Sequence, residues 1–205
     1  SRQFTVSLVL LAVSFMSLFG TIILLPIYMQ EVLGYDTLRA GLTLLPGGLT
    51  MGLLAPFVGR LFDRFGAKPL IIPGSLVVSA AIWGMTMLGE NSEQWMVIAA
   101  HVTLSVGLAL MFTPLMTSAL GDLPKSLYSH GSAVVTTAQQ LAGAAGTAMF
   151  VVVMANSTVA AAGQGFGPIS AEAQGIHSAF LVGACISLVT IVGTFFVKST
   201  PRREG

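Results

Sequence analysis

Two segments of this chain place hydroxyl and amide side chains at helical spacing within otherwise apolar sequence. The first has Ser, Thr and Tyr at intervals of seven, and the second has Thr and Gln at steps of three and four. Such steps put side chains on one face of a helix. That face either contacts a ligand or bonds to neighbouring helices, and both alternatives stay open. The candidate contact residues are Ser14, Ser17, Thr21, Tyr28, Thr136, Gln139 and Gln140.

A third segment has chemistry suited to an adaptable apolar pocket. Met111, Phe112 and Met116 surround Pro114, which bends a helix by removing a backbone hydrogen bond. Methionine side chains adapt to ligands of varied shape. The alternative is that these residues are ordinary core or lipid-facing side chains.

Titratable groups are scarce inside the apolar segments. His101, His130 and His177 are far apart in sequence and near the ends of those segments, so we interpret them as interfacial polar residues. Their spacing does not match that of metal ligands, and we expect no metal and no cofactor. The single cysteine, Cys185, has no intrachain partner for a disulfide.

The elements that position these residues follow from composition. Of the 205 residues, 54% are hydrophobic and 8% are charged, and the mean hydropathy of +0.86 is that of a membrane protein. Six uncharged intervals remain between the charged residues; five have 20 to 28 residues and one has 46. A helix needs about 20 apolar residues to cross a bilayer. In the longest interval, the Gly-rich stretch Val159–Ser170 is predicted to be an outside loop. The predicted spans are 4–28, 40–62, 69–88, 95–120, 131–156 and 176–197.

Charge placement supports six crossings and predicts their orientation. With six spans both termini share a side, and eight of the nine basic residues fall there, leaving Arg39 alone on the other side. Basic residues accumulate on the cytoplasmic face of membrane proteins. We therefore expect a multi-pass protein of the plasma (inner) membrane with both termini of the segment in the cytoplasm. The basic residues are spread over separate loops, so no nucleic-acid partner is expected.

The loop between the second and third spans reads Gly59-Arg-Leu-Phe-Asp63-Arg64-Phe-Gly66-Ala-Lys68. Gly59 permits close helix approach, Gly66 permits a sharp reversal, and Asp63 can pair with a neighbouring Arg. The sequence resembles the G-x-x-x-D-R/K-x-G-R/K loop of the major facilitator superfamily. This resemblance implies that Gly59, Asp63, Arg64, Gly66 and Lys68 form a gating motif.

Two further segments narrow the resemblance. The stretch from Leu25-Pro26 to Pro46-Gly47, together with the later Gly131-Ser132-Ala133 and Gln140-Leu-Ala-Gly143, is similar to the second half of the fourteen-spanner drug:proton antiporters. Those proteins commonly have Arg-Gln where this chain has Gln139-Gln140, so a role tied to that Arg does not carry over. The chain starts at Ser1 without an initiator Met, and we expect it to be a fragment or a processed form.

The resemblance implies an all-α polytopic membrane protein, with six transmembrane helices forming one half of a major-facilitator bundle as two three-helix repeats. It implies export of amphipathic or cationic drugs in exchange for protons by alternating access, with a small-molecule substrate, protons, the lipid bilayer and an absent amino-terminal half as partners. No span has a carboxylate near its middle, so the coupling acids are expected in the absent half.

Other functions remain open or fit poorly. The alternatives are a non-transporting membrane scaffold or truncated half, and a facilitator-type transporter of another solute. An enzyme is not expected, because neither Gly74-Ser75 nor Gly131-Ser132 completes an intramembrane protease pattern and no phosphate-binding loop occurs. For a channel, only the weak Gly-rich stretch around Gly165 could form a selectivity segment.

Overall fold

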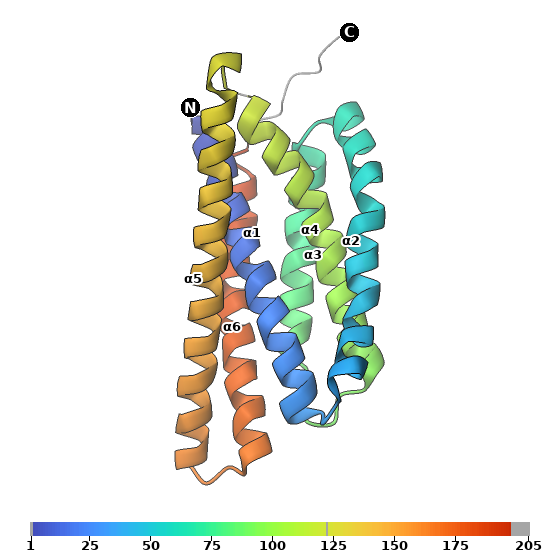
Figure 1. Ribbon diagram of the computed structural model, residues 1–205, viewed down its shortest axis with the longest axis vertical. Helices are drawn as coiled ribbons and strands as arrows, with labels where there is room; N and C mark the ends of the chain where they lie inside the picture. Colours follow the sequence, from blue (N-terminus) through green and yellow to red (C-terminus); the bar gives the residue numbers. More distant parts are fainter. Residues whose placement is uncertain (1, 122, 198–205) are drawn as a thin grey trace.

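The protein is a bundle of six long helices in a computed structural model that describes residues 2–121 and 123–197 (Figure 1). Within these residues there is no strand, which confirms the all-α prediction. All six helices are long and apolar enough to cross a membrane. Their bounds are α1 (Arg2–Ile27), α2 (Thr37–Phe65), α3 (Lys68–Met85), α4 (Gln94–Gly121), α5 (Tyr128–Gly163) and α6 (Pro168–Thr194).

Short irregular elements complete the chain. A π-helical turn, Tyr28–Val32, extends α1, and a 3₁₀ turn, Lys125–Leu127, precedes α5. Pro26 lies just before the π turn; its missing N–H leaves one carbonyl of α1 without a helical donor, and the looser turn follows. At the start of α2, the Asp36 carboxylate accepts a hydrogen bond of 2.7 Å from the backbone N–H of Arg39.

The predicted loop over Val159–Ser170 is wrong in extent. Helix α5 continues to Gly163, α6 begins at Pro168, and the connection spans only residues 164–167. With 36 residues α5 is about 54 Å long, which exceeds the hydrocarbon layer by several turns. Figure 1 shows α5 and α6 projecting beyond the other helices at one end. The polar and glycine residues there stay helical because α5 and α6 pack against each other.

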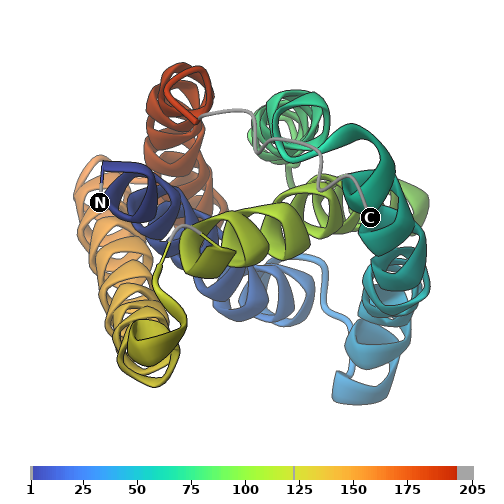
Figure 2. The same ribbon diagram turned by 90° about the horizontal axis from the view of Figure 1, so that it is seen from above.

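The helices are arranged around a central pair. Helix α1 packs against α4, with α5 beside α1 and α2 beside α4, while α3 and α6 lie behind them and contact each other (Figure 2). Helix α2 therefore packs mainly on α4, and α5 packs on α1 and α6. Of the six spans, α2 and α5 have the smallest buried shares.

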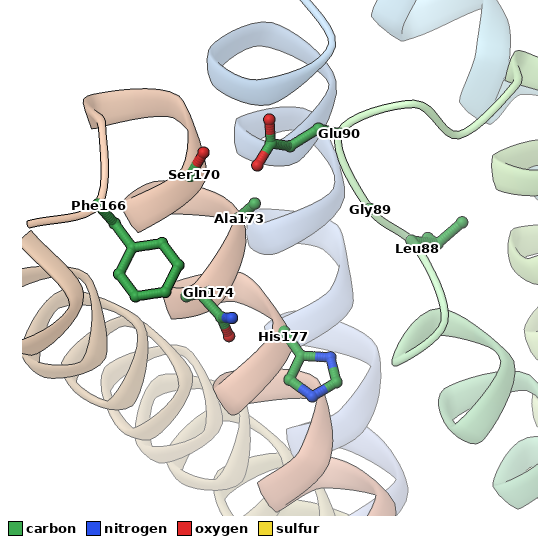
Figure 3. Close-up of a pocket in the computed structure, with 8 residues that line it drawn as sticks. All are labelled: Leu88, Gly89, Glu90, Phe166, Ser170, Ala173, Gln174 and His177. Carbon is green, nitrogen blue, oxygen red and sulfur yellow. The ribbon is translucent and has the colours of Figure 1, made fainter. Parts of the chain in front are cut away.

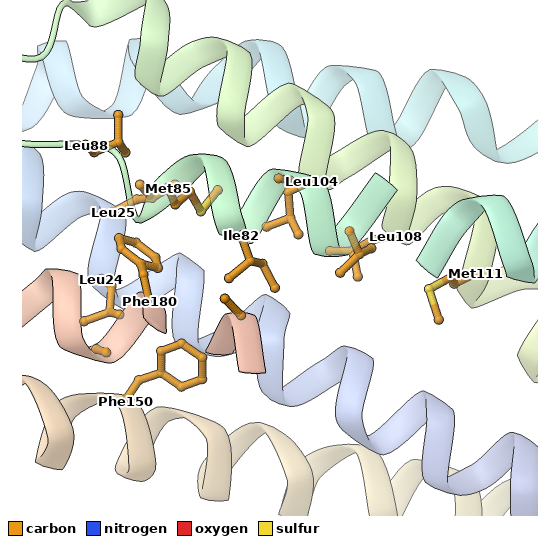
Figure 4. Close-up of a cluster of buried hydrophobic side chains, with 14 of the residues drawn as sticks. Leu24, Leu25, Ile82, Met85, Leu88, Leu104, Leu108, Met111, Phe150 and Phe180 are labelled. Carbon is orange, nitrogen blue, oxygen red and sulfur yellow. The ribbon is translucent and has the colours of Figure 1, made fainter. Parts of the chain in front are cut away.

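Apolar side chains from several helices fill the core. Figure 4 shows Leu24 and Leu25 of α1, Ile82 and Met85 of α3, Leu104 and Leu108 of α4, and Phe180 of α6, with Phe150 reaching in from α5. Glycines allow close helix crossings at its edge: a Cβ added to Gly146 would lie 2.6 Å from the backbone of Met16. Tight packing replaces the hydrophobic effect as the force between helices in lipid.

Candidate functional site

A groove on the outside of the bundle runs between α1 and α5. It has a volume of about 580 Å³. Phe19 forms its wall on α1, and the ring sits over Gly143, where an added Cβ would lie 3.1 Å from a ring carbon. The remaining wall belongs to α5 and combines small and apolar residues with the polar Gln140 and Thr147. An apolar cleft with few polar groups suits an amphipathic ligand.

An aromatic row leads from this groove towards α4. The Phe15 ring stacks between those of Phe19 and Phe112, with centroid distances of 6.0 and 4.8 Å. All three side chains are half-buried, so part of each ring is left uncovered by the described helices. The row can offer stacking surface to a planar ligand. Sequence reasoning missed Phe15 and Phe19; their i,i+4 spacing, opposite the polar stripe of α1, was the available signal.

The polar stripe of α1 faces the interior of the bundle. Ser14, Ser17, Thr21 and Tyr28 are all at most 4% exposed. The Ser14 hydroxyl donates a 2.8 Å hydrogen bond to the Leu10 carbonyl of its own helix. The Tyr28 hydroxyl donates a 2.7 Å hydrogen bond to the Gly89 carbonyl in the loop after α3. These contacts favour the packing alternative for this stripe, because none of the four side chains lines the groove.

The polar residues of α5 separate in the structure. Gln140 is exposed and lines the groove, whereas Thr136 is exposed one turn away from it and Gln139 is half-buried. On α4, Met111 is 1% exposed and belongs to the core, whereas Met116 is only half-buried. Of the residues predicted to contact a ligand, Gln140 lines the groove and Phe112 belongs to the aromatic row that leads from it.

The motif loop joins α2 and α3 by a sharp reversal at Gly66, whose φ of +79° favours glycine. The Gly66 N–H donates a 2.7 Å hydrogen bond to the Phe62 carbonyl, which closes the end of α2. Asp63 and Arg64 are exposed, and Lys68 begins α3. We call this end of the bundle the motif end.

The interactions expected within this motif are not made by the described residues. The Arg64 guanidinium lies 5.1 Å from the centroid of the Phe65 ring, and Asp63 forms no ion pair with any side chain that the structure describes. No described atom lies within 4 Å of a Cβ added to Gly59, so no helix of this bundle approaches closely there. Both Asp63 and Gly59 are left open to a partner surface.

A second pocket, of about 290 Å³, opens at the end opposite the motif end (Figure 3). Glu90 contributes a carboxylate from the loop after α3, Phe166 a ring from the loop after α5, and Gln174 and His177 polar groups from α6. The His177 Nδ1 lies 2.8 Å from the Thr86 carbonyl oxygen, which only accepts hydrogen bonds, so this nitrogen carries the proton.

The three histidines occupy different environments. His130 is exposed in the first turn of α5, and His177 ties α6 to the end of α3. His101, predicted to lie near a helix end, is two turns inside α4 and packs against Gly47 of α2. Among residues 2–121 and 123–197, no three His, Cys, Asp or Glu side chains come together to hold a metal ion.

Comparisons with known proteins agree with this architecture. The family model described as Major Facilitator Superfamily matches residues 1–147. The lincomycin resistance proteins of Listeria monocytogenes and Bacillus subtilis are 36% and 33% identical over 96% of the chain, covering 43% and 42% of the relatives. The chain thus spans less than half the length of these curated relatives.

A solved structure shows the same fold. It is described as a bacterial homologue of the human drug peptide transporters, and it matches with a TM-score of 0.81 at 18% identity over 100% of this chain and 45% of that one. The family consists of transporters rather than enzymes, and the six apolar helices make this a multi-pass membrane protein. The chain belongs to the major facilitator superfamily.

Proposed function

We propose that this chain is the carboxy-terminal half of an exporter that moves amphipathic or cationic drugs out of the cell in exchange for protons. The groove between α1 and α5 carries this proposal, because it joins the Phe19 ring and an apolar wall to Gln140 and Thr147. An aromatic face attracts a cation, and an amide oxygen accepts a hydrogen bond from one. Similarity to lincomycin resistance proteins over nearly the whole chain supports export of drug-like solutes.

In this proposal a second six-helix half covers the groove. The uncovered faces of α2 and α5 support such packing, because α2 has a row of exposed Leu and Phe residues from Leu38 to Phe65. Exposed Leu and Phe side chains are also compatible with lipid. A line of glycines on the same helix, however, would allow the backbone of a partner helix to approach closely. Gly41, Gly48, Gly52 and Gly59 lie within about 40° of one another around α2 and face open space.

The two halves would rock about the groove to open it alternately to each side of the membrane. Asp63, Arg64, Gly59, Gly66 and Lys68 act as a latch at the motif end, which we place in the cytoplasm of the plasma membrane together with both termini of the segment. The exposed Asp63 carboxylate supports this role, because it is free to pair with a group on the other half in one conformation and to separate from that group in the other.

Ethidium efflux from membrane vesicles under a proton gradient tests the proposal. We expect efflux by the full-length protein and none by residues 1–205 alone. Asp63→Asn removes the charge of the latch and should lower the efflux rate by about tenfold while ethidium binding changes by less than about twofold. Glu172→Gln, a carboxylate change in the first turns of α6, is the matched control and should leave efflux unchanged. Full efflux by the Asp63→Asn variant would contradict the latch.

A transporter of another solute is the second candidate. The riboflavin transporter of Clostridioides difficile is 26% identical over 98% of this chain. The groove, with its aromatic wall and few polar groups, also suits a neutral planar solute. Competition separates the candidates: unlabelled cationic dyes should inhibit ethidium efflux, whereas inhibition by neutral planar solutes and not by cations would favour the second function.

A further inference from the structure

His101 has an unusual position for an ionisable side chain. It lies two turns inside α4, and its imidazole occupies the space left by the missing side chain of Gly47 on α2. A Cβ at Gly47 would overlap the ring at Nδ1. By contrast, the next residue, Gly48, faces open space. Because Gly47 has no side chain, the imidazole can pack directly against the backbone of α2 at this point.

The hydrogen-bonding groups of the His101 imidazole are not all paired. His101 Nδ1 is buried and has no hydrogen-bond partner of good geometry among the described residues, and the Leu44 carbonyl is the backbone group that can accept from the ring. Buried polar atoms are nearly always paired, and in a membrane an unpaired one is more costly still. A structural histidine would be expected to donate to a neighbour, as His177 does to Thr86. The arrangement at His101 instead leaves a nitrogen available to change its protonation state.

No charged side chain of the surrounding helices neutralises this site. Helix α2 has no Asp, Glu, Lys or Arg between Arg39 and Arg60, and α3 has none between Lys68 and Glu90. None occurs in α4, and α1 has none between Arg2 and Glu31. The Arg39 guanidinium lies 3.8 Å from the Tyr35 ring centroid and donates to Gln94 Oε1 at 3.2 Å, so it is held at the helix end.

We propose that His101 is the proton-binding site of this half, an inference that rests on the proton exchange proposed above. One imidazole nitrogen takes up a proton from water on one side of the membrane, and the imidazolium later returns that proton to water on the other side. The neutral ring fits the apolar α2–α4 contact, whereas the imidazolium adds a charge that the contact does not pair. Proton uptake thus favours conformations in which α2 and α4 separate and the ring reaches water.

The local sequence of α2 supports such a movement. Pro46 directly precedes Gly47 and has no backbone N–H, so α2 lacks the helical hydrogen bond to the Leu42 carbonyl at this level. The buried share of α2 is also the smallest of the six spans, and within this chain α2 packs mainly on α4. A change of charge at His101 therefore acts on the contact that holds α2, at a level where α2 lacks a helical hydrogen bond.

The transport test compares single substitutions in the full-length protein. His101→Gln keeps a polar side chain of similar length but cannot carry the proton, and it should reduce efflux driven by a pH gradient about tenfold or more with dye binding changed less than about twofold. His130→Gln, an exposed histidine of α5, is the control and should retain efflux. Gly47→Ala should reproduce the loss by displacing the imidazole, and Gly84→Ala should not, because no described atom lies within 4 Å of a Cβ added at Gly84 of α3. Gradient-driven efflux retained by both His101→Gln and Gly47→Ala would overturn the proposal.

A second measurement tests proton binding at His101 independently of transport. With ¹⁵N-histidine in the full-length protein in nanodiscs, the imidazole signal absent from the His101→Gln variant should change with pH between about 5 and 9. A signal constant over that range overturns the proposal even if dye is exported. If the unmodified protein shows no proton-driven efflux, the proposed function fails, and this titration alone then decides whether His101 takes up a proton.

Discussion

Gly107 of α4 lies against the backbone of α3, and Gly107→Ala tests whether this close crossing holds the bundle together. A Cβ at residue 107 would lie 2.7 Å from both the N and Cγ2 atoms of Val78 and 2.9 Å from the carbonyl oxygen of Gly74. Two of these three atoms are backbone atoms, so a side-chain rotation cannot relieve the overlap. The two helices must move apart instead.

The size of the effect follows from these distances. Non-bonded carbon atoms pack at about 3.5–4.0 Å, so α3 and α4 must separate by roughly 1 Å at this point. Overpacking of this kind costs about 1–3 kcal/mol. The better helix propensity of Ala over Gly offsets about 0.5–1 kcal/mol. We therefore expect Gly107→Ala to lower the free energy of unfolding by about 0.5–2 kcal/mol.

Unfolding of the protein in detergent by increasing SDS, followed by tryptophan fluorescence, measures this difference. Gly84→Ala is the matched control, because it makes the same chemical change in α3, where no described atom lies within 4 Å of the added Cβ. It should be neutral or slightly stabilising. If Gly107→Ala and Gly84→Ala had the same unfolding midpoint, the crossing of α3 and α4 would not be as close as described.

Two further predictions concern the groove and the end opposite the motif end. Ala144 lines the groove, and Ala145 is exposed beside it. In a fluorescence titration of the full-length protein, Ala144→Leu should weaken ethidium binding by about tenfold and Ala145→Leu by less than about twofold. Equal effects of the two substitutions would contradict the groove as the ethidium site. Tyr28→Phe removes the hydrogen bond to Gly89 and should lower stability in SDS by about 1 kcal/mol, and an unchanged midpoint would contradict that contact.

The number and type of helices could be predicted from sequence because lipid restricts the charged residues to the helix ends. Each long uncharged interval therefore corresponds to a spanning helix, with the one exception that had to be divided. The division was misplaced at Val159–Ser170 because glycine and glutamine end helices in water-exposed turns, whereas here α5 and α6 pack together and stay helical to residues 163 and 168. Tertiary packing outweighed local preference.

The candidate site was harder to predict. Helical spacing correctly groups Ser14, Thr21 and Tyr28 on one face, but it does not say whether that face meets a cavity or another helix. The face of α1 that the described helices leave uncovered is the apolar one, with Phe15 and Phe19, because hydroxyl groups gain more from hydrogen bonds to neighbouring helices than from apolar surroundings. Which helix covers which face depends on the packing of α1 against α4 and α5, and no local pattern encodes it.

The surroundings of His101 were missed for a related reason. The predicted span beginning at residue 95 placed it within two turns of a helix end, and α4 does begin at Gln94, but the packing of the imidazole against α2 was not predicted. The glycine that makes room for it, Gly47, lies on another helix and more than fifty residues away. The contact between the two residues depends on how α2 packs on α4, which cannot be predicted from the local sequence around either residue.

Photolabelling with an azide derivative of ethidium tests the central claim most directly. The full-length protein in membranes is irradiated with the bound dye, digested, and the labelled residues are identified by mass spectrometry. We predict labels on the two walls of the groove, around Phe19 of α1 and Gln140 of α5, that excess unlabelled ethidium removes. Labels confined to α3 and α6, or labels that excess ethidium does not remove, would contradict the assignment of the groove as the drug site.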